Sequence, residues 1–153
     1  MYIILLFFAD SASARIWPET VADFHQTPAT GLREDQADTI VALVAKHQGY
    51  RVYLDGSVIE RLTGEGRGQI DPIPGYFYYR IGFNGQNNDT IVYSQYYHIN
   101  KTTGDVFVSR VPDSLECKRI SFPELRKIQT LIMKNTGDHL ATKEEASRSI
   151  GCR

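Results

Sequence analysis

Five short runs of strand-forming residues follow one another between residues 50 and 111, covering 50–54, 57–62, 76–83, 90–99 and 105–111. These runs are rich in β-branched and aromatic residues, which favour pleated, half-buried positions. Parallel strands need a long crossover connection, usually a helix, whereas the segments between these runs are turns and one loop rich in glycine and proline. The sequence therefore predicts an antiparallel meander. The dipeptide Asp55-Gly56 is suited to the tight turn of its first hairpin.

A helical pattern precedes these runs, from about Arg33 to Gln48. Acidic residues occupy its first turns and Lys46 and His47 lie in its last, as the helix dipole favours. Gly49 follows as a helix stop. The apolar stripe consists of Ala37, Ile40, Val41, Val44 and Gln48. A shorter helix, from Pro18 to Phe24, is expected upstream.

Two further helical patterns follow the runs. Ser121 and Glu124 have the spacing of a capping box, and the helix that they would open ends at Gly137. Thr142 and Glu145 have the same spacing and open a short final helix. Strands grouped between helices indicate an α+β fold. We predict one N-terminal helix packed on a bent antiparallel sheet of four to five strands, followed by two C-terminal helices.

The first fourteen residues resemble a secretory leader. Residues 2–9 form an apolar run, and small residues follow up to Ala14, where a signal peptidase could cut. No Lys or Arg precedes the run, and the alternative interpretation is a buried first strand. We predict a signal peptide at residues 1–14, a single domain at 15–153 and a periplasmic or secreted location. No stretch approaches the roughly 20 apolar residues of a membrane span.

The two cysteines suit an exported protein. Cys117 precedes the first C-terminal helix, and Cys152 is next to the last residue. In an oxidising compartment a disulfide between them would fasten the C-terminal tail to the body of the domain. The alternative is two unrelated thiols.

The charge balance narrows the choice of partner. The chain has 17 Lys and Arg and 18 Asp and Glu, a formal net charge of −1. Nucleic acid and anionic lipid attract a basic field, which this balance does not supply. We therefore expect no nucleic-acid partner.

Motifs for catalysis or metal binding are missing from the sequence. The glycine loop 64–68 joins two strands and contains no lysine, unlike a phosphate-binding P-loop. The four histidines lie in different elements, and none pairs with another at metal-ligand spacing. No G-x-S-x-G elbow is present. We predict no catalytic residue, no metal, no cofactor and no enzyme activity.

Tyrosines are concentrated on two strands expected to be neighbours. Alternation places about half of them on the face turned away from the N-terminal helix. In the run 90–99 it assigns Tyr93 and Tyr97 to the inner face, toward that helix, and Tyr96 to the outer face. They could serve sheet packing, or they could form a face that binds a protein partner. His98 is expected on this outer face as an exposed residue. The candidate partner-binding residues are Tyr76, Tyr78, Tyr96, His98 and Arg67.

One segment carries a family resemblance. Residues 96–106 end a strand, turn through Asn100-Lys101-Thr102-Thr103-Gly104 and resume an apolar strand at Val106. This segment resembles the final hairpin of PepSY-like domains, and the order of the helices and strands is similar to that of cystatin-like domains. Small exported bacterial inhibitors and toxin-immunity proteins use comparable hairpins.

These observations together predict an exported, non-enzymatic binding protein. Its expected form is an inhibitor or toxin-immunity protein that occludes a partner enzyme, such as a toxin or hydrolase, with its outer sheet face and the loops 63–75 and 84–89. The alternative is a cystatin- or NTF2-like pocket protein that binds or processes a small ligand, with His98 and tyrosines pointing into the pocket. A third possibility is a structural accessory of an envelope assembly.

Overall fold

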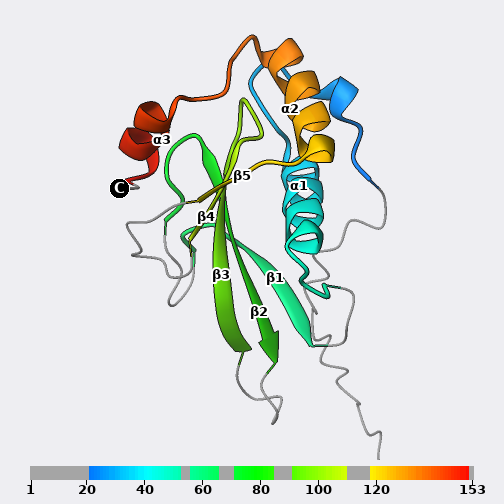
Figure 1. Cartoon of the computed structure of the whole chain (residues 1–153), viewed down its shortest axis with the longest axis vertical. Helices are drawn as coiled ribbons and strands as arrows, with labels where there is room; N and C mark the ends of the chain where they lie inside the picture. The colour runs from blue at the N-terminus through cyan, green and yellow to red at the C-terminus, as the bar shows by residue number, and fades with distance from the viewer. Residues whose placement is uncertain (1–20, 53–55, 66–70, 85–90, 110–117, 152–153) are drawn as a thin grey trace, which may run out of the picture.

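The computed structural model describes residues 21–52, 56–65, 71–84, 91–109 and 118–151 of the chain (Figure 1). Its helices are the short 3-10 helix η1 (Phe24–Gln26), α1 (Glu34–His47), α2 (Pro123–Thr136) and α3 (Lys143–Ile150). Its strands are β1 (Ser57–Leu62), β2 (Tyr76–Asn84), β3 (Ile91–Asn100), β4 (Val106–Ser109) and β5 (Lys118–Ile120). The predicted α+β class, with one N-terminal helix, one antiparallel sheet and two C-terminal helices, is confirmed.

The sheet is a meander in which each strand pairs only with its neighbours in sequence. The order is β1-β2-β3-β4-β5 and every pairing is antiparallel. The turn between β3 and β4 is held by the side chain of Asn100, whose Oδ1 accepts hydrogen bonds from the backbone N–H groups of Thr102 and Thr103. Gly104 follows with a positive φ of 69° and lies against the side chains of Ile132 and Ile40.

One strand prediction differs from the structure, and one strand was not predicted. Residues 50–52 are not a strand. The backbone N–H of Tyr50 donates to the carbonyl of Ala45 in the last turn of α1, so it is not available to pair with another strand. Residues 53–55 lie outside the described part, and so does part of the predicted hairpin turn. The fifth strand is instead β5, whose three residues are too few to show an alternating pattern in sequence.

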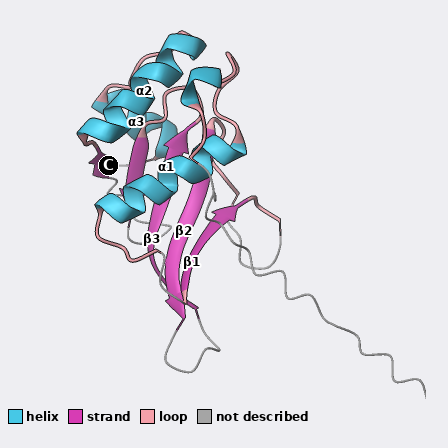
Figure 2. Cartoon of the chain, turned by 90° about the vertical axis from the view of Figure 1, so that its right-hand side faces the viewer, coloured by secondary structure: helices cyan, strands magenta, loops and turns pink. Residues whose placement is uncertain are grey.

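Helices α1 and α2 lie on one face of the sheet (Figures 1 and 2). The predicted apolar stripe of α1 faces the sheet, and Ala37, Ile40, Val41 and Val44 are fully buried. On the sheet side they meet Tyr79, Ile81, Tyr97 and Ile99, which are also inaccessible to solvent. Gln48, the last member of the stripe, lies half-buried just after the helix. The N-terminal helix predicted at 18–24 is only partly covered by the described residues, where the 3-10 turn η1 begins at Phe24.

The two C-terminal helices begin differently from each other. The capping box at Thr142 and Glu145 is confirmed, with both reciprocal hydrogen bonds present. The one at Ser121 and Glu124 is wrong, because α2 starts one residue later with Phe122 as its N-cap. Proline at position 123 forces the preceding residue into an extended conformation, and that residue becomes the cap. Ser121 instead accepts a hydrogen bond from Arg126 Nε at 2.8 Å.

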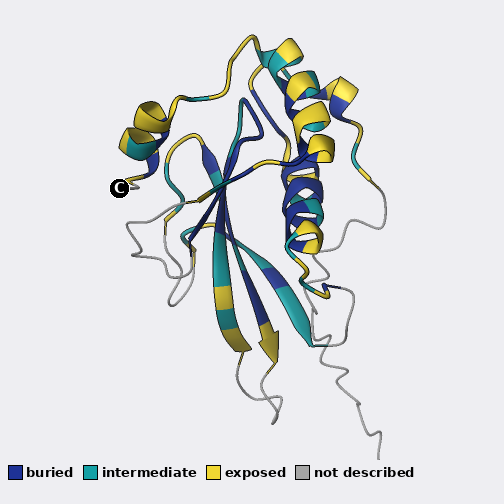
Figure 3. Cartoon of the chain, in the orientation of Figure 1, coloured by how far each residue is buried: buried dark blue, intermediate teal, exposed yellow. Residues whose placement is uncertain are grey.

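Helix α3 packs on the opposite face of the sheet from α1 and α2 (Figure 1). Its buried residues Ala146 and Ile150 form a second, smaller apolar cluster with Tyr76 of β2 and Phe107 of β4. The sheet is therefore covered by helices on both faces at one end. At the other end β2 and β3 extend beyond the helices (Figures 1 and 3).

Candidate functional site

Strand alternation sorts the tyrosines of β2 and β3 into an inner and an outer set. The inner set, Tyr79 and Tyr97, is fully buried beneath α1. The Tyr79 hydroxyl donates to Asp38 Oδ1 at 2.6 Å, and the Tyr97 hydroxyl donates to Gln48 Oε1 at 2.6 Å. Burial raises the pKa of both phenols well above the ordinary value. These two tyrosines join the sheet to α1 and are structural.

The outer set is centred on a stack of Tyr78 and His98. Their ring centroids are 4.4 Å apart and the rings are nearly parallel, while the Tyr96 ring lies 5.9 Å from that of Tyr78. His98 is on the predicted face, but the expectation that it is exposed is wrong, since only 7% of it is accessible. Burial lowers the pKa of the imidazole to about 4, so His98 is neutral at pH 7.

Tyr76 lies beneath α3 on the same outer face. Its hydroxyl shares a 2.9 Å hydrogen bond with Ser149 Oγ, and its ring packs with Ala146 and Ile150. The pattern of α3 in the sequence shows where the helix begins. It does not show which face of the sheet the helix covers, so the burial of Tyr76 could not be foreseen.

The predicted contact residues therefore differ in accessibility. Tyr76, Tyr78 and His98 are buried within the chain itself, whereas Tyr96 is half-buried. Arg67 lies outside the described residues. The structure brings Tyr78, Tyr96 and His98 together on the outer face and places Tyr76 on the same face under α3.

A charged and aromatic cluster continues the outer face toward β1. Arg80 forms a 2.6 Å ion pair with Glu60, and its guanidinium lies 3.7 Å from the centre of the Tyr93 ring. The Tyr93 hydroxyl donates to the same Glu60 at 2.8 Å. Tyr93 was predicted on the inner face, but a β-bulge at Ile81/Gly82 shifts the register of β3. One extra residue in a strand reverses the alternation beyond it.

The free end of the β2–β3 hairpin exposes apolar side chains. Phe83 is 36% exposed, Ile91 38% and Val92 61%. We call Phe83, Asn84, Ile91 and Val92 the hairpin tip. None of these four residues was among the predicted contact residues. The available signal was a group of large apolar residues on both sides of the polar turn 84–89.

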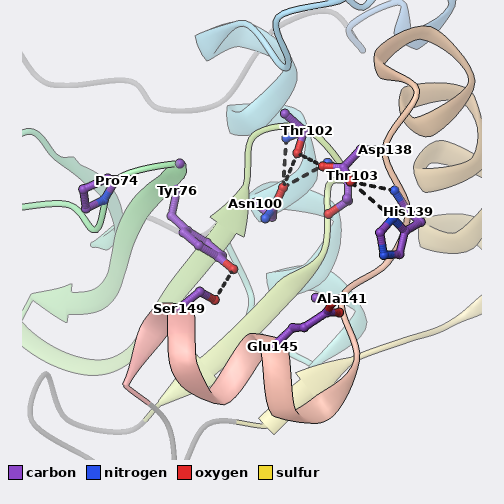
Figure 4. A pocket seen from close by; sticks show the side chains of 11 residues that line it. Pro74, Tyr76, Asn100, Thr102, Thr103, Asp138, His139, Ala141, Glu145 and Ser149 are labelled. Carbon is purple, nitrogen blue, oxygen red and sulfur yellow. Dashed lines mark hydrogen bonds and ion pairs between the residues drawn. The ribbon is translucent and has the colours of Figure 1, made fainter.

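A depression of about 380 Å³ lies at the opposite end of the sheet, between the β3–β4 turn and α3 (Figure 4). Asp138 and His139 line one side and Glu145 another. The hydrogen bond from Thr102, followed by that from the His139 N–H, lowers the pKa of Asp138. Hydrogen bonds from Thr142 lower that of Glu145. Both carboxylates are thus ionised acceptors with structural partners, and neither resembles a general acid.

Neither a metal-ligating cluster nor a membrane-spanning helix is found among the described residues. No group of three or more His, Cys, Asp or Glu side chains in the described ranges is arranged to hold a metal ion. None of the helices in that part of the chain is long and apolar enough to span a bilayer. The inner face of the sheet, which a cystatin- or NTF2-like pocket would need, is filled by α1 and α2. The described residues form a small α+β domain whose hairpin tip carries exposed apolar side chains.

Comparison with known proteins refines this class. The family model described as "T6SS, Immunity protein Tgi2PP" matches residues 31–144. The chain therefore belongs to this family of immunity proteins. A solved chain from "Structure of a type VI secretion system effector-immunity complex from Pseudomonas protegens" is 27% identical, with a TM-score of 0.69 over 86% of this chain and 98% of that chain. No curated protein matches. The immunity-protein part of the resemblance is thus confirmed, but the cystatin- and PepSY-like part is not.

Proposed function

We propose that this chain is an immunity protein that binds an effector of a type VI secretion system and blocks it without chemistry of its own. The observation that carries the proposal is the family match at 31–144, because that range contains α1, the whole sheet and α2. The similar chain comes from an effector–immunity complex and has the same fold over almost its whole length. The surfaces described above are consistent with a protein that acts by binding another protein.

The mode of block that we propose is occlusion of the partner's active site. The part of the outer sheet face that α3 leaves uncovered is available for this, together with the loops 63–75 and 84–89. Within this face Tyr78 and His98 support the surface from below, and Tyr96 is the accessible member of the set. Arg67 remains a proposed contact, as does Tyr76 through its support of α3.

We further propose that the protein acts in the periplasm after removal of residues 1–14. The cysteines would then form the Cys117–Cys152 disulfide. Mass spectrometry of protein recovered from a periplasmic extract tests both claims. We expect a mature N-terminus at Arg15 and a mass lower than that of the reduced chain by two hydrogen atoms. An intact N-terminus would contradict the leader, and two alkylatable thiols would contradict the disulfide.

The central test needs the effector enzyme, which is to be sought first in the genes next to that of this chain. The purified enzyme and this chain should form a stoichiometric complex by size-exclusion chromatography, and the enzyme should lose activity on its own substrate. Cells that produce the enzyme in the periplasm should grow only when this chain is co-produced. If the chain neither binds the enzyme nor protects the cells, the proposal is wrong.

A further inference from the structure

We propose that the hairpin tip is an anchor that inserts its apolar side chains into a concave, apolar cleft on the effector. This inference rests on the proposed function and specifies the surface that serves it. The residues that carry it are Phe83, Ile91 and Val92.

The tip gathers exposed apolar residues at one place. Three of the five exposed large hydrophobic residues in the described part of the chain belong to it, and the other two, Val21 and Leu140, lie in the segments before α1 and α3. Single exposed apolar residues are ordinary, whereas a cluster marks an interaction site. Figure 3 shows this end of the hairpin exposed beyond the helices.

The tip presents apolar atoms on both of its faces. Phe83 pairs with Val92 across the two strands, and Asn84 pairs with Ile91. Because paired residues share a face and successive residues alternate, Phe83 and Val92 point to one side and Ile91 points to the other. A flat partner could cover only one side. A cleft that surrounds the hairpin covers both.

The base of the tip is held in place by side chains on each face. On the inner side the Tyr50 ring stacks on Phe83 at 6.0 Å and its hydroxyl donates to Gln95. On the outer side Arg80 lies over Tyr93, as described above. A fixed anchor loses little conformational entropy on binding, which favours affinity.

The charge of the tip selects the kind of partner. Its four residues are uncharged, and Arg80 and Glu60 on the outer face beside its base neutralise each other in an ion pair. Such a surface complements a neutral apolar cleft better than a strongly charged one.

A second copy of the chain is the competing occupant. Stable interfaces need about 800 Å² from each partner. In a two-fold dimer the four tip residues of each copy would meet the same four residues of the other, far fewer than the roughly 20–30 residues that a stable interface uses on each side. A concave partner encloses the same tip and buries far more of it.

The test compares two valines. Val92→Asp changes the tip, and Val21→Asp makes the same change at an 84% exposed valine before η1. Each full-length variant is titrated calorimetrically against the purified effector that binds the wild-type chain in the test above. We expect Val92→Asp to weaken binding by about tenfold or more and Val21→Asp to leave it unchanged. Val92→Thr keeps the β-branched shape and decides the matter if the aspartate variant fails to fold, with an expected loss of about threefold.

The outcomes separate this inference from the function on which it rests. Equal affinity of wild type and Val92 variants would overturn the tip as an anchor and leave the immunity function intact. A wild-type chain that does not bind the effector would overturn both. Light scattering that finds a dimer, dissociated by Val92→Asp, would assign the tip to a second copy and overturn the inference.

Discussion

Arg119 of β5 forms a 2.7 Å ion pair with Asp105, which is almost fully buried at the start of β4. The same guanidinium donates to the Ala141 carbonyl in the segment that leads to α3, and it lies over the Phe107 ring. One side chain thus joins the last strand to the start of β4 and to the segment before α3. This contact explains how a short three-residue strand contributes to the fold.

Asp105→Ala should lower the free energy of unfolding by about 2 kcal/mol, because it removes the partner of a half-buried arginine. Asp35→Ala is the matched control, since Asp35 pairs with Arg33 where both side chains are largely exposed. Exposed pairs contribute roughly 1 kcal/mol or less. Urea unfolding of both variants measures the difference. Equal effects would show that the Asp105 pair has no special role.

His98 should make the fold sensitive to acid. Its pKa is about 4 in the folded chain against an ordinary value of 6.5, so below pH 6.5 the unfolded chain takes up a proton that the folded chain refuses. Stability from this residue is therefore full above pH 6.5 and is lost as the pH falls toward 4. The loss amounts to roughly 3 kcal/mol.

The variant His98→Phe can retain the stack on Tyr78 but cannot take up a proton. Its free energy of unfolding should fall less between pH 7 and pH 4 than that of wild type, as measured by urea titration at each pH. His139→Phe, at an exposed histidine, should follow the wild-type curve. Parallel curves for wild type and His98→Phe would contradict the low pKa of His98.

Gly82→Ala should destabilise the hairpin by about 2 kcal/mol through crowding at the bulge. An added Cβ would lie 2.7 Å from the Val92 carbonyl oxygen and 2.9 Å from both Ile91 and Tyr93 side-chain atoms. Gly49→Ala meets no atom within 4 Å and carries only the strain of its positive φ, about 1 kcal/mol. Thermal unfolding compares them. A Gly82 variant as stable as wild type would show that the bulge can move.

Ile150→Asp should release α3 from the sheet while the rest of the fold persists, because Ile150 and Ala146 are the buried residues of that helix. Hydrogen exchange should become fast in α3 and stay slow in α2. Lys143→Asp, an exposed change in the first turn where the helix dipole favours acid, serves as control. Loss of protection in α2 as well would mean that α3 belongs to the main core.

The general plan of the fold could be predicted from local patterns. Short turns between strand-like runs led to the meander, and the spacing of Ile40, Val41 and Val44 identified the buried side of α1. Thr142 and Glu145 fixed the start of α3 because both halves of a capping box lie within four residues. Each of these signals acts within one element or between neighbours.

The errors on the outer face arose where distant residues decide the outcome, whereas the start of α2 was moved by the neighbouring Pro123. Burial of His98 and Tyr76 depends on what covers the outer face. The position of α3 on the sheet could not be predicted from the sequence. The bulge at Gly82 reversed the orientation of Tyr93, although strict alternation predicted the opposite. Tyr50 had strand-forming neighbours, but its backbone N–H was already engaged by the end of α1.

The strict neighbour-to-neighbour order of the sheet has a consequence for folding. Each strand pairs with the one made just before it, so every pairing closes a short stretch of chain and the average sequence separation of contacts within the sheet stays low. Topologies of this kind fold faster than those that need distant strands to meet. On the proposed export route the chain would cross a membrane unfolded, and this order would let the sheet form again one hairpin at a time before the partner is met.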